Sequence, residues 1–289
     1  MIYQIVVSGL TLGAIYALIA IGFTIVFSTM KLINFAHGEF VMAGGLVYGF
    51  LHFSMGMPVL AAAGLSLALC CLFGWLVYVL GVKGVDSSNH IAQVMITLGL
   101  GITAKGIAQV VIGKNTVFPP ALPGLPPLAM GGITIAPQSL WIVIALVLFM
   151  AALYLVLKYT WLGLSMRAVA INGYAAVLMG ISPNRTSAAA FVVAGLLGGA
   201  AGILLAPLAS ASYDNGIFLG IKGFAAAILG GIGNPVGAVI GGLVLGLAEA
   251  VAAGYISSIY KDAITLSLLL VILLLRPQGL IGEKLPQKL

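Results

Sequence analysis

The sequence predicts an all-α, polytopic membrane protein with about eight to ten transmembrane helices, broken half-helices included. Hydrophobic residues make up 62% of the 289 residues and charged residues only 6%, whereas a soluble domain carries about 25% charged residues. Uncharged runs such as 5–27 and 59–82 reach the roughly 20 residues that a helix needs to cross a bilayer. These runs are continuous and do not alternate, which argues against a β-barrel.

Nine hydrophobic segments follow one another along the chain, and no large soluble domain interrupts them. They span residues 5–27, 34–54, 59–82, 91–112, 139–158, 186–207, 216–233, 236–256 and 258–276. The first is expected to be a retained span, because residues 1–4 contain no basic residue and no signal cleavage site. The sequence therefore predicts one transmembrane domain over residues 1–289, and its 39 glycines suit close helix packing in lipid.

The distribution of basic residues predicts the orientation. Loop 159–185 contains Arg167 and Arg185 but no acidic residue, and basic loops between membrane helices are cytoplasmic. The C-terminal tail is also basic and is expected on the same side; its charges are Arg276, Lys284 and Lys288 against Glu283. The net charge of +6 is spread over loops and is interpreted as topology, not as nucleic-acid binding.

The number of complete crossings decides where the N-terminus lies. Nine full crossings place the N-terminus outside and put Lys31 and Lys83 inside. If segment 34–54 or 216–233 enters and leaves the membrane on the same side, the number of crossings becomes even and the N-terminus changes side. The sequence leaves both arrangements open.

Loop 113–138 is expected to be an extended, structured external loop. It carries one charge, Lys114, and six prolines, which are Pro119, Pro120, Pro123, Pro126, Pro127 and Pro137. Partner docking and a simple connection are both compatible with this composition.

Two hydrophobic segments look broken, one in each half of the chain. Segments 34–45 and 220–235 open with polar or glycine residues, run for a short stretch and then meet a glycine pair. Unwound backbone at membrane depth must line a cavity or be buried in protein, so matching breaks indicate a substrate pathway. Loose glycine-rich packing is the alternative.

Three ionisable residues lie within or at the start of apolar segments: His37, Glu39 and Glu249. Such residues face protein or water, because an Asp, Lys or Arg in the bilayer costs about 2.5–3.5 kcal/mol. If this stretch starts a half-helix, Glu39 lies in the first turn and its negative charge complements the positive end of the helix dipole. Glu249 could form a helix–helix hydrogen bond or contact the pathway. The candidate pathway residues are Asn34, His37, Glu39, Gly44, Gly230, Gly231 and Glu249.

The sequence offers no catalytic set. It contains no P-loop, no Cys/His spacing typical of zinc and no G-x-S-x-G elbow. We therefore predict a chain that is not an enzyme and that binds no metal or cofactor of its own, so any ATP hydrolysis takes place in another subunit.

Four stretches together resemble the permease subunits of branched-chain amino acid ABC importers, the LivH type. They are residues 33–40, 167–181, 223–249 and 276–282. The resemblance implies a type II-like importer fold in the bacterial inner membrane. It also implies a second related but non-identical permease, two subunits that hold ATP and Mg, and a periplasmic binding protein.

The resemblance also implies a coupling helix in the cytoplasmic loop. Importer permeases dock on the ATPase through the pattern Glu-Ala-Ala, three residues, Gly. Here Tyr174 replaces the glutamate, whereas Ala175, Ala176 and Gly180 match. Arg167 is the residue expected to supply a charge instead, and we predict one short helix over residues 167–180.

The expected function is to form the translocation pathway for Leu, Ile and Val. A permease for urea, short amides or a broader range of amino acids is the alternative within the same class. From a different class, an ion-coupled secondary transporter would work without an ATPase and would not need loop 159–185.

Overall fold

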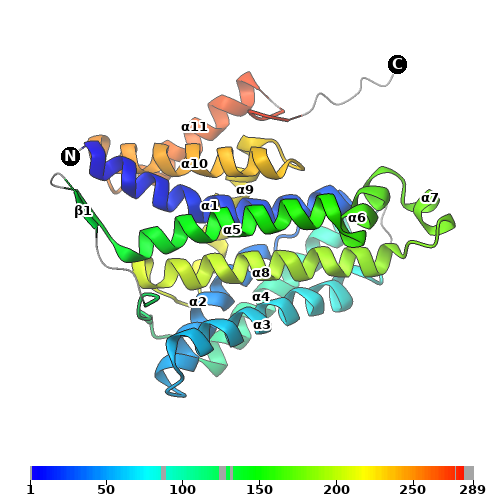
Figure 1. Ribbon diagram of the computed structural model, residues 1–289, viewed down its shortest axis with the longest axis horizontal. Coiled ribbons are helices and arrows are strands. Elements are labelled where there is room, and N and C mark those ends of the chain that lie inside the picture. The colour runs from blue at the N-terminus through cyan, green and yellow to red at the C-terminus, as the bar shows by residue number, and fades with distance from the viewer. Residues whose placement is uncertain (1, 86–88, 124–127, 131–132, 277, 283–289) are drawn as a thin grey trace.

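The structure is a computed structural model that describes residues 2–85, 89–123, 128–130, 133–276 and 278–282. It is a helical bundle (Figure 1), so the predicted all-α membrane fold is confirmed. The charges at Glu283, Lys284 and Lys288, which the topology prediction used, lie outside the described residues.

Six helices in the described part of the chain are long and apolar enough to cross a membrane. They are α1 (Ile2–Met30), α3 (Val59–Val77), α4 (His90–Val111), α5 (Pro137–Tyr159), α8 (Pro183–Ala209) and α10 (Pro235–Val251). Two of them are extended by single π-helical turns, η1 (Tyr78–Val82) after α3 and η2 (Ala252–Ile256) after α10.

The other helices are shorter. They are α2 (His37–Phe53), α6 (Trp161–Ile171), α7 (Gly173–Leu178), α9 (Asn215–Gly230) and α11 (Lys261–Leu275). Three of these, α2, α9 and α11, lie in segments that were predicted to be hydrophobic spans. As helices they are too short to span a bilayer. Segment 34–54 is shortened because residues 32–34 are not helical, so α2 begins only at His37.

Helix α1 is buried over most of its length and forms the centre of the bundle. Helix α10 packs antiparallel to it, because Gly9 faces Leu247 and Ala250 while Ala17 faces Gly242. On its other sides α1 contacts α8, α9 and α5. Figure 1 shows α1, α5, α8 and α10 running side by side along the long axis of the molecule.

Helix α8 connects this centre to α2 and α3. Gly199 approaches the backbone of Gly44 on α2, and Gly195 approaches that of Cys70 on α3. Small residues at these crossings let the backbones come together, which is how helices associate in lipid.

The two ends of the bundle differ. The start of α1 and the antiparallel strands β1 (Leu128–Met130) and β2 (Ile133–Ile135) lie at one end, while α6 and α7 lie at the other (Figure 1). A cavity of about 640 Å³ at the α7 end is lined by Met30, Lys83 and Tyr174. Lys83 and the end of α1 before Lys31 are therefore at the same end of the bundle as the basic loop. Nine full crossings are not confirmed, because only six helices in the described residues are long and apolar enough to span a membrane.

The proline-rich loop is anchored at the opposite end. Val117 pairs with Ala211 in an isolated β-bridge, and the Tyr48 hydroxyl donates a hydrogen bond of 2.8 Å to the Pro120 carbonyl. The described part of the loop is thus structured, and its position outside the membrane stays a prediction.

We predict that Gly246→Ala lowers the melting temperature of the protein in detergent, because the new Cβ would collide with the backbone of Gly13 on α1. The matched control is Gly99→Ala on α4, where a Cβ meets nothing within 4 Å. Alanine is favoured over glycine in a helix by about 1 kcal/mol, so this control should melt at the same temperature or higher. Equal melting temperatures for the two variants would contradict the close α1–α10 packing.

Candidate functional site

The basic loop holds two helices, so the prediction of a single helix over residues 167–180 is wrong. Helix α6 ends at Ile171, and α7 begins at Gly173. Asn172 between them has an extended backbone, with φ −156° and ψ 102°. Its side chain accepts a hydrogen bond of 3.0 Å from the Ala175 N–H, which caps α7 and makes the break favourable.

This break separates the residues of the predicted coupling helix. Arg167 lies on α6 and is exposed, while Ala175 and Ala176 lie on α7. Gly180 lies in the turn after α7 with φ +80°, a conformation that favours glycine. Gly180 is therefore a turn residue and not part of the helix.

The loop around α7 exposes large apolar side chains. They are Ile171, Tyr174, Val177, Leu178 and Met179, and Tyr174 and Met179 are 78% and 81% exposed. Exposed apolar groups clustered on a short surface helix mark a protein interaction site. Ala176, by contrast, is buried beneath them.

The starts of α2 and α9, one from each segment predicted to be broken, meet inside the bundle. The predicted break at Gly44 and Gly45 is wrong, because α2 continues through both glycines to Phe53, whereas α9 does end at Gly230. A Cβ on Gly38, in the first turn of α2, would collide with Gly216 and Gly220 in the first turns of α9. The N-termini of two half-helices, one from each half of the chain, are therefore in backbone contact. This is the arrangement that half-helices take around a binding site in transporters.

His37 and Glu39 point to different neighbours, as their spacing predicts. The His37 ring lies 3.0 Å from the Ile19 carbonyl of α1, measured from Nε2, and stacks edge-on against Phe23. The Glu39 carboxylate points toward Gly216 of α9 and lies in the first turn of α2. Both side chains and that of Asn34 are buried.

Each of these three residues also has a buried polar atom without a hydrogen-bond partner. The atoms are Asn34 Nδ2, His37 Nδ1 and Glu39 Oε2. Buried polar groups in native proteins are almost always paired, so unpaired ones mark places where water or a ligand binds. Of the seven candidate pathway residues, these three carry this signal.

The candidate glycines are explained by packing. Gly44 contacts Gly199 of α8, and Gly230 contacts Gly237 at the turn from α9 to α10. Gly231 has φ +103° and lies against Gly282. None of the three is brought together with Asn34, His37 and Glu39 by a contact in the described structure.

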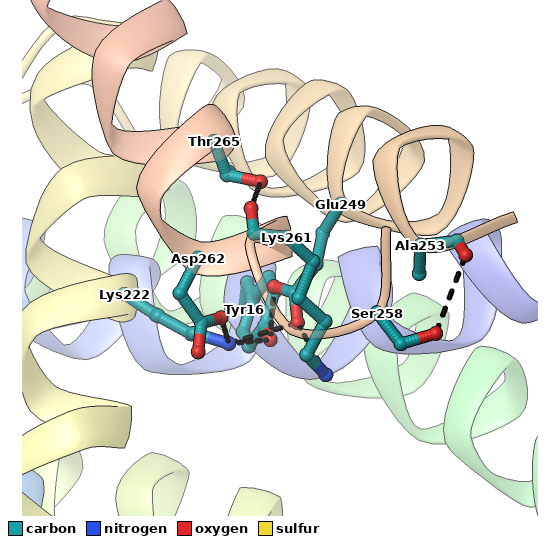
Figure 2. A network of polar contacts seen from close by, with 8 residues as sticks. All are labelled: Tyr16, Lys222, Glu249, Ala253, Ser258, Lys261, Asp262 and Thr265. Atoms are coloured by element: carbon teal, nitrogen blue, oxygen red, sulfur yellow. Dashed lines mark hydrogen bonds and ion pairs between the residues drawn. The ribbon is translucent and has the colours of Figure 1, made fainter. Parts of the chain in front are cut away.

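Glu249 belongs to a separate cluster (Figure 2), in which its carboxylate is 2% exposed. The Tyr16 hydroxyl donates to Glu249 Oε2 at 2.8 Å. Lys222 Nζ lies 2.8 Å and Lys261 Nζ 3.1 Å from Glu249 Oε1. Lys222 Nζ also lies 2.7 Å from Asp262 Oδ1.

The partners of Glu249 were not predicted from the sequence. Lys222 is the one signal that was available, because it is a lone charge inside the second broken segment. Within the residues described, no group of three or more His, Cys, Asp or Glu residues is placed to hold a metal ion.

A bundle of membrane-length helices with the starts of two shorter helices meeting inside it is the architecture of a multi-pass membrane transport protein. The model of the family described as "Branched-chain amino acid transport system / permease component" matches residues 5–273. The chain belongs to this family, and it is a transport component and not an enzyme.

Individual relatives extend this finding. The high-affinity branched-chain amino acid transport permease LivH of Escherichia coli K12 is 34% identical, over 96% of this chain and 94% of its own. BraD of Pseudomonas aeruginosa PAO1, named for the same transport, is 33% identical over 97% and 95%. The ribose import permease RbsC of Escherichia coli K12 is 29% identical over 81% and 73%.

We predict that Gly216→Ala destabilises the protein, because its Cβ would lie within 2.8 Å of Glu39 Oε1. In the Glu39→Ala variant, Gly216→Ala should lower the free energy of unfolding by less, because the carboxylate that the new Cβ would meet is absent. Residues in contact show coupling energies of about 0.5–3 kcal/mol in double-mutant cycles. The coupling energy is measured by unfolding the wild type, the two single variants and the double variant. Additive effects would contradict the contact between the two half-helices.

Proposed function

We propose that this chain is a permease subunit of an ATP-binding-cassette importer that moves branched-chain amino acids across the bacterial inner membrane. The similarity to LivH and BraD over nearly the whole of both chains carries this proposal. A periplasmic binding protein delivers Leu, Ile or Val, and the permease forms the pathway that the amino acid follows.

The substrate class rests on a comparison within the family. LivH of Escherichia coli K12 and BraD match 94–95% of their own length at 33–34% identity, whereas the ribose permease matches 73% at 29%. The apolar bundle suits aliphatic side chains. The alternative substrates, urea and short amides, are tested directly below.

The apolar side chains around α7 form the docking surface for an ATP-binding subunit, in which ATP and Mg²⁺ reside. Tyr174 takes the place of the glutamate in the coupling pattern, so docking here relies on apolar contact. Asn172 separates α7 from α6, and this break lets α7 sit as a short rigid element in a groove of its partner. Arg167 is exposed on α6 and can pair with an acidic group there.

The translocation pathway passes the junction of α2 and α9. The unpaired atoms of Asn34, His37 and Glu39 support this position, since a passing polar group or its water would satisfy them. A second, related permease covers the pathway from the other side, so two permeases and two ATP-binding subunits make up the membrane assembly.

Co-purification of the tagged chain from its native membrane, followed by mass spectrometry, tests this assembly. We expect two ATP-binding subunits and a second permease, together with a binding protein that binds Leu and Val in preference to urea and ribose. Recovery of the chain alone in mild detergent would contradict the importer and favour an ion-coupled secondary transporter.

We predict that Val177→Asp on α7 abolishes recovery of the ATP-binding subunit while the amount of protein in the membrane is unchanged. Val177 is exposed, so the substitution leaves the bundle intact but places a charge in an apolar interface, which is costly without a partner. The matched control is Met55→Asp, at an exposed residue between α2 and α3. Normal recovery with Val177→Asp would show that α7 is not the docking helix.

A further inference from the structure

The charged cluster around Glu249 joins four helices at one point. Lys222 comes from α9, Glu249 from α10, Tyr16 from α1, and Lys261 and Asp262 from the start of α11. Figure 2 shows the Lys222 ammonium next to Asp262 and Tyr16, with the Glu249 side chain coming toward it from α10. Two lysines and two carboxylates alternate, so the cluster is electrically neutral.

Lys222 has three partners in this cluster. Its ammonium contacts Glu249, Asp262 and, at 3.2 Å, the Tyr16 hydroxyl. A charge within a membrane helix is costly unless it is paired, so Lys222 is held where its three acceptors are. Because these acceptors lie on α1, α10 and α11, Lys222 fixes the middle of α9 against all three.

The flanks of α9 are points where the backbone can turn. Ser210, between α8 and α9, has φ +66°, and Gly231, directly after α9, has φ +103°. Such conformations are uncommon for residues other than glycine. The chain therefore turns before and after α9, and contacts with α1, α2, α10 and α11 hold the helix between these turns.

The C-terminal segment holds α9 at two places. At its start Asp262 pairs with Lys222. At its end the Leu280 and Ile281 N–H groups donate to the Leu229 and Gly230 carbonyls, at 2.8 and 3.1 Å. An ion pair from the start of α11 and two backbone hydrogen bonds from residues 280–281 thus hold α9 at two places.

The inward face of α9 is the face that meets α2. Gly216 and Gly220 contact the first turn of α2, and Gly223 contacts Ile19 on α1. The opposite face carries bulky exposed side chains, Ile217, Phe218 and Ile221. A small rotation or shift of α9 therefore changes both the junction with α2 and the exposed surface at once.

We propose that Lys222 is a positioning residue for transport: through Glu249, Asp262 and Tyr16 it sets the position of α9 and hence the geometry of the α2–α9 junction. The expected effect on uptake rests on the proposed function, whereas the expected effect on the position of α9 does not.

The Lys222→Met variant tests the proposal. Glu249 keeps Tyr16 and Lys261 as partners in this variant, so it is not left as an unpaired buried charge. The purified complex is reconstituted in liposomes, and Leu uptake and ATP hydrolysis are measured per folded complex. We expect the maximal uptake rate to fall about tenfold while ATP hydrolysis continues, so that fewer substrate molecules are moved per ATP.

Two further variants frame this result. Lys222→Arg keeps the positive charge and should restore most of the uptake. Lys114→Met removes an exposed lysine from the proline-rich loop and should leave uptake unchanged. Wild-type uptake by Lys222→Met, or an equal loss with Lys222→Arg, would overturn the positioning role.

A distance measurement separates this proposal from the proposed function. Spin labels are placed at Phe218→Cys on α9 and Val147→Cys on α5, both exposed, with Cys70 and Cys71 replaced by Ala. Lys222→Met should shift or broaden the distance distribution, and Lys222→Arg should not. Unchanged distances would overturn the proposal, whereas a shift in a chain without ATP-driven uptake would contradict only the importer function.

Discussion

Close approach of helix backbones at glycine is the constraint on which this fold depends. Helix α1 can lie at the centre of the bundle only because Gly9 and Gly13 meet Leu247 and Gly246 of α10 without side chains between them. In lipid, helices gain no hydrophobic energy by leaving an apolar solvent, so packing and polar contacts must hold them together. The same device brings α8 against α2 and α3 and brings the two half-helices together.

The second requirement of the bilayer is that each polar group finds a partner inside the protein. Glu249 meets it through Tyr16, Lys222 and Lys261, and the cluster connects α9 to the helices that surround it. At the α2–α9 junction the requirement is only partly met, because atoms of His37 and Glu39 stay unpaired. These unpaired atoms are the observation that supports the proposed position of the pathway.

Hydrophobic pattern predicted the membrane class and the nine segments, because span length and lack of charge follow directly from bilayer thickness. It could not give the lengths of α2, α9 and α11, which depend on where the neighbouring helices allow the backbone to unwind. The break at Asn172 was missed although asparagine favours helix caps and the pair Asn172-Gly173 favours a turn. In the structure, the hydrogen bond from the Ala175 N–H shows that Asn172 caps α7.

The sequence identified individual residues of the candidate site but not the pairs that they form. Glycine breaks and buried charges are visible in a sequence, so His37, Glu39 and Glu249 were identified. The pairing of Lys222 with Glu249 joins residues on two different helices, and no local pattern reports it. Whether Glu249 contacts the pathway or another helix was open, and the structure places it in a helix–helix cluster.

The most direct test of this account is uptake of labelled leucine by proteoliposomes that contain the chain, its second permease, the ATP-binding subunits and the binding protein. Leucine uptake should require ATP on the side of the membrane that carries the ATP-binding subunits, and it should stop when these subunits are omitted. Leucine accumulation by the chain alone, driven by an ion gradient and indifferent to ATP, would contradict it.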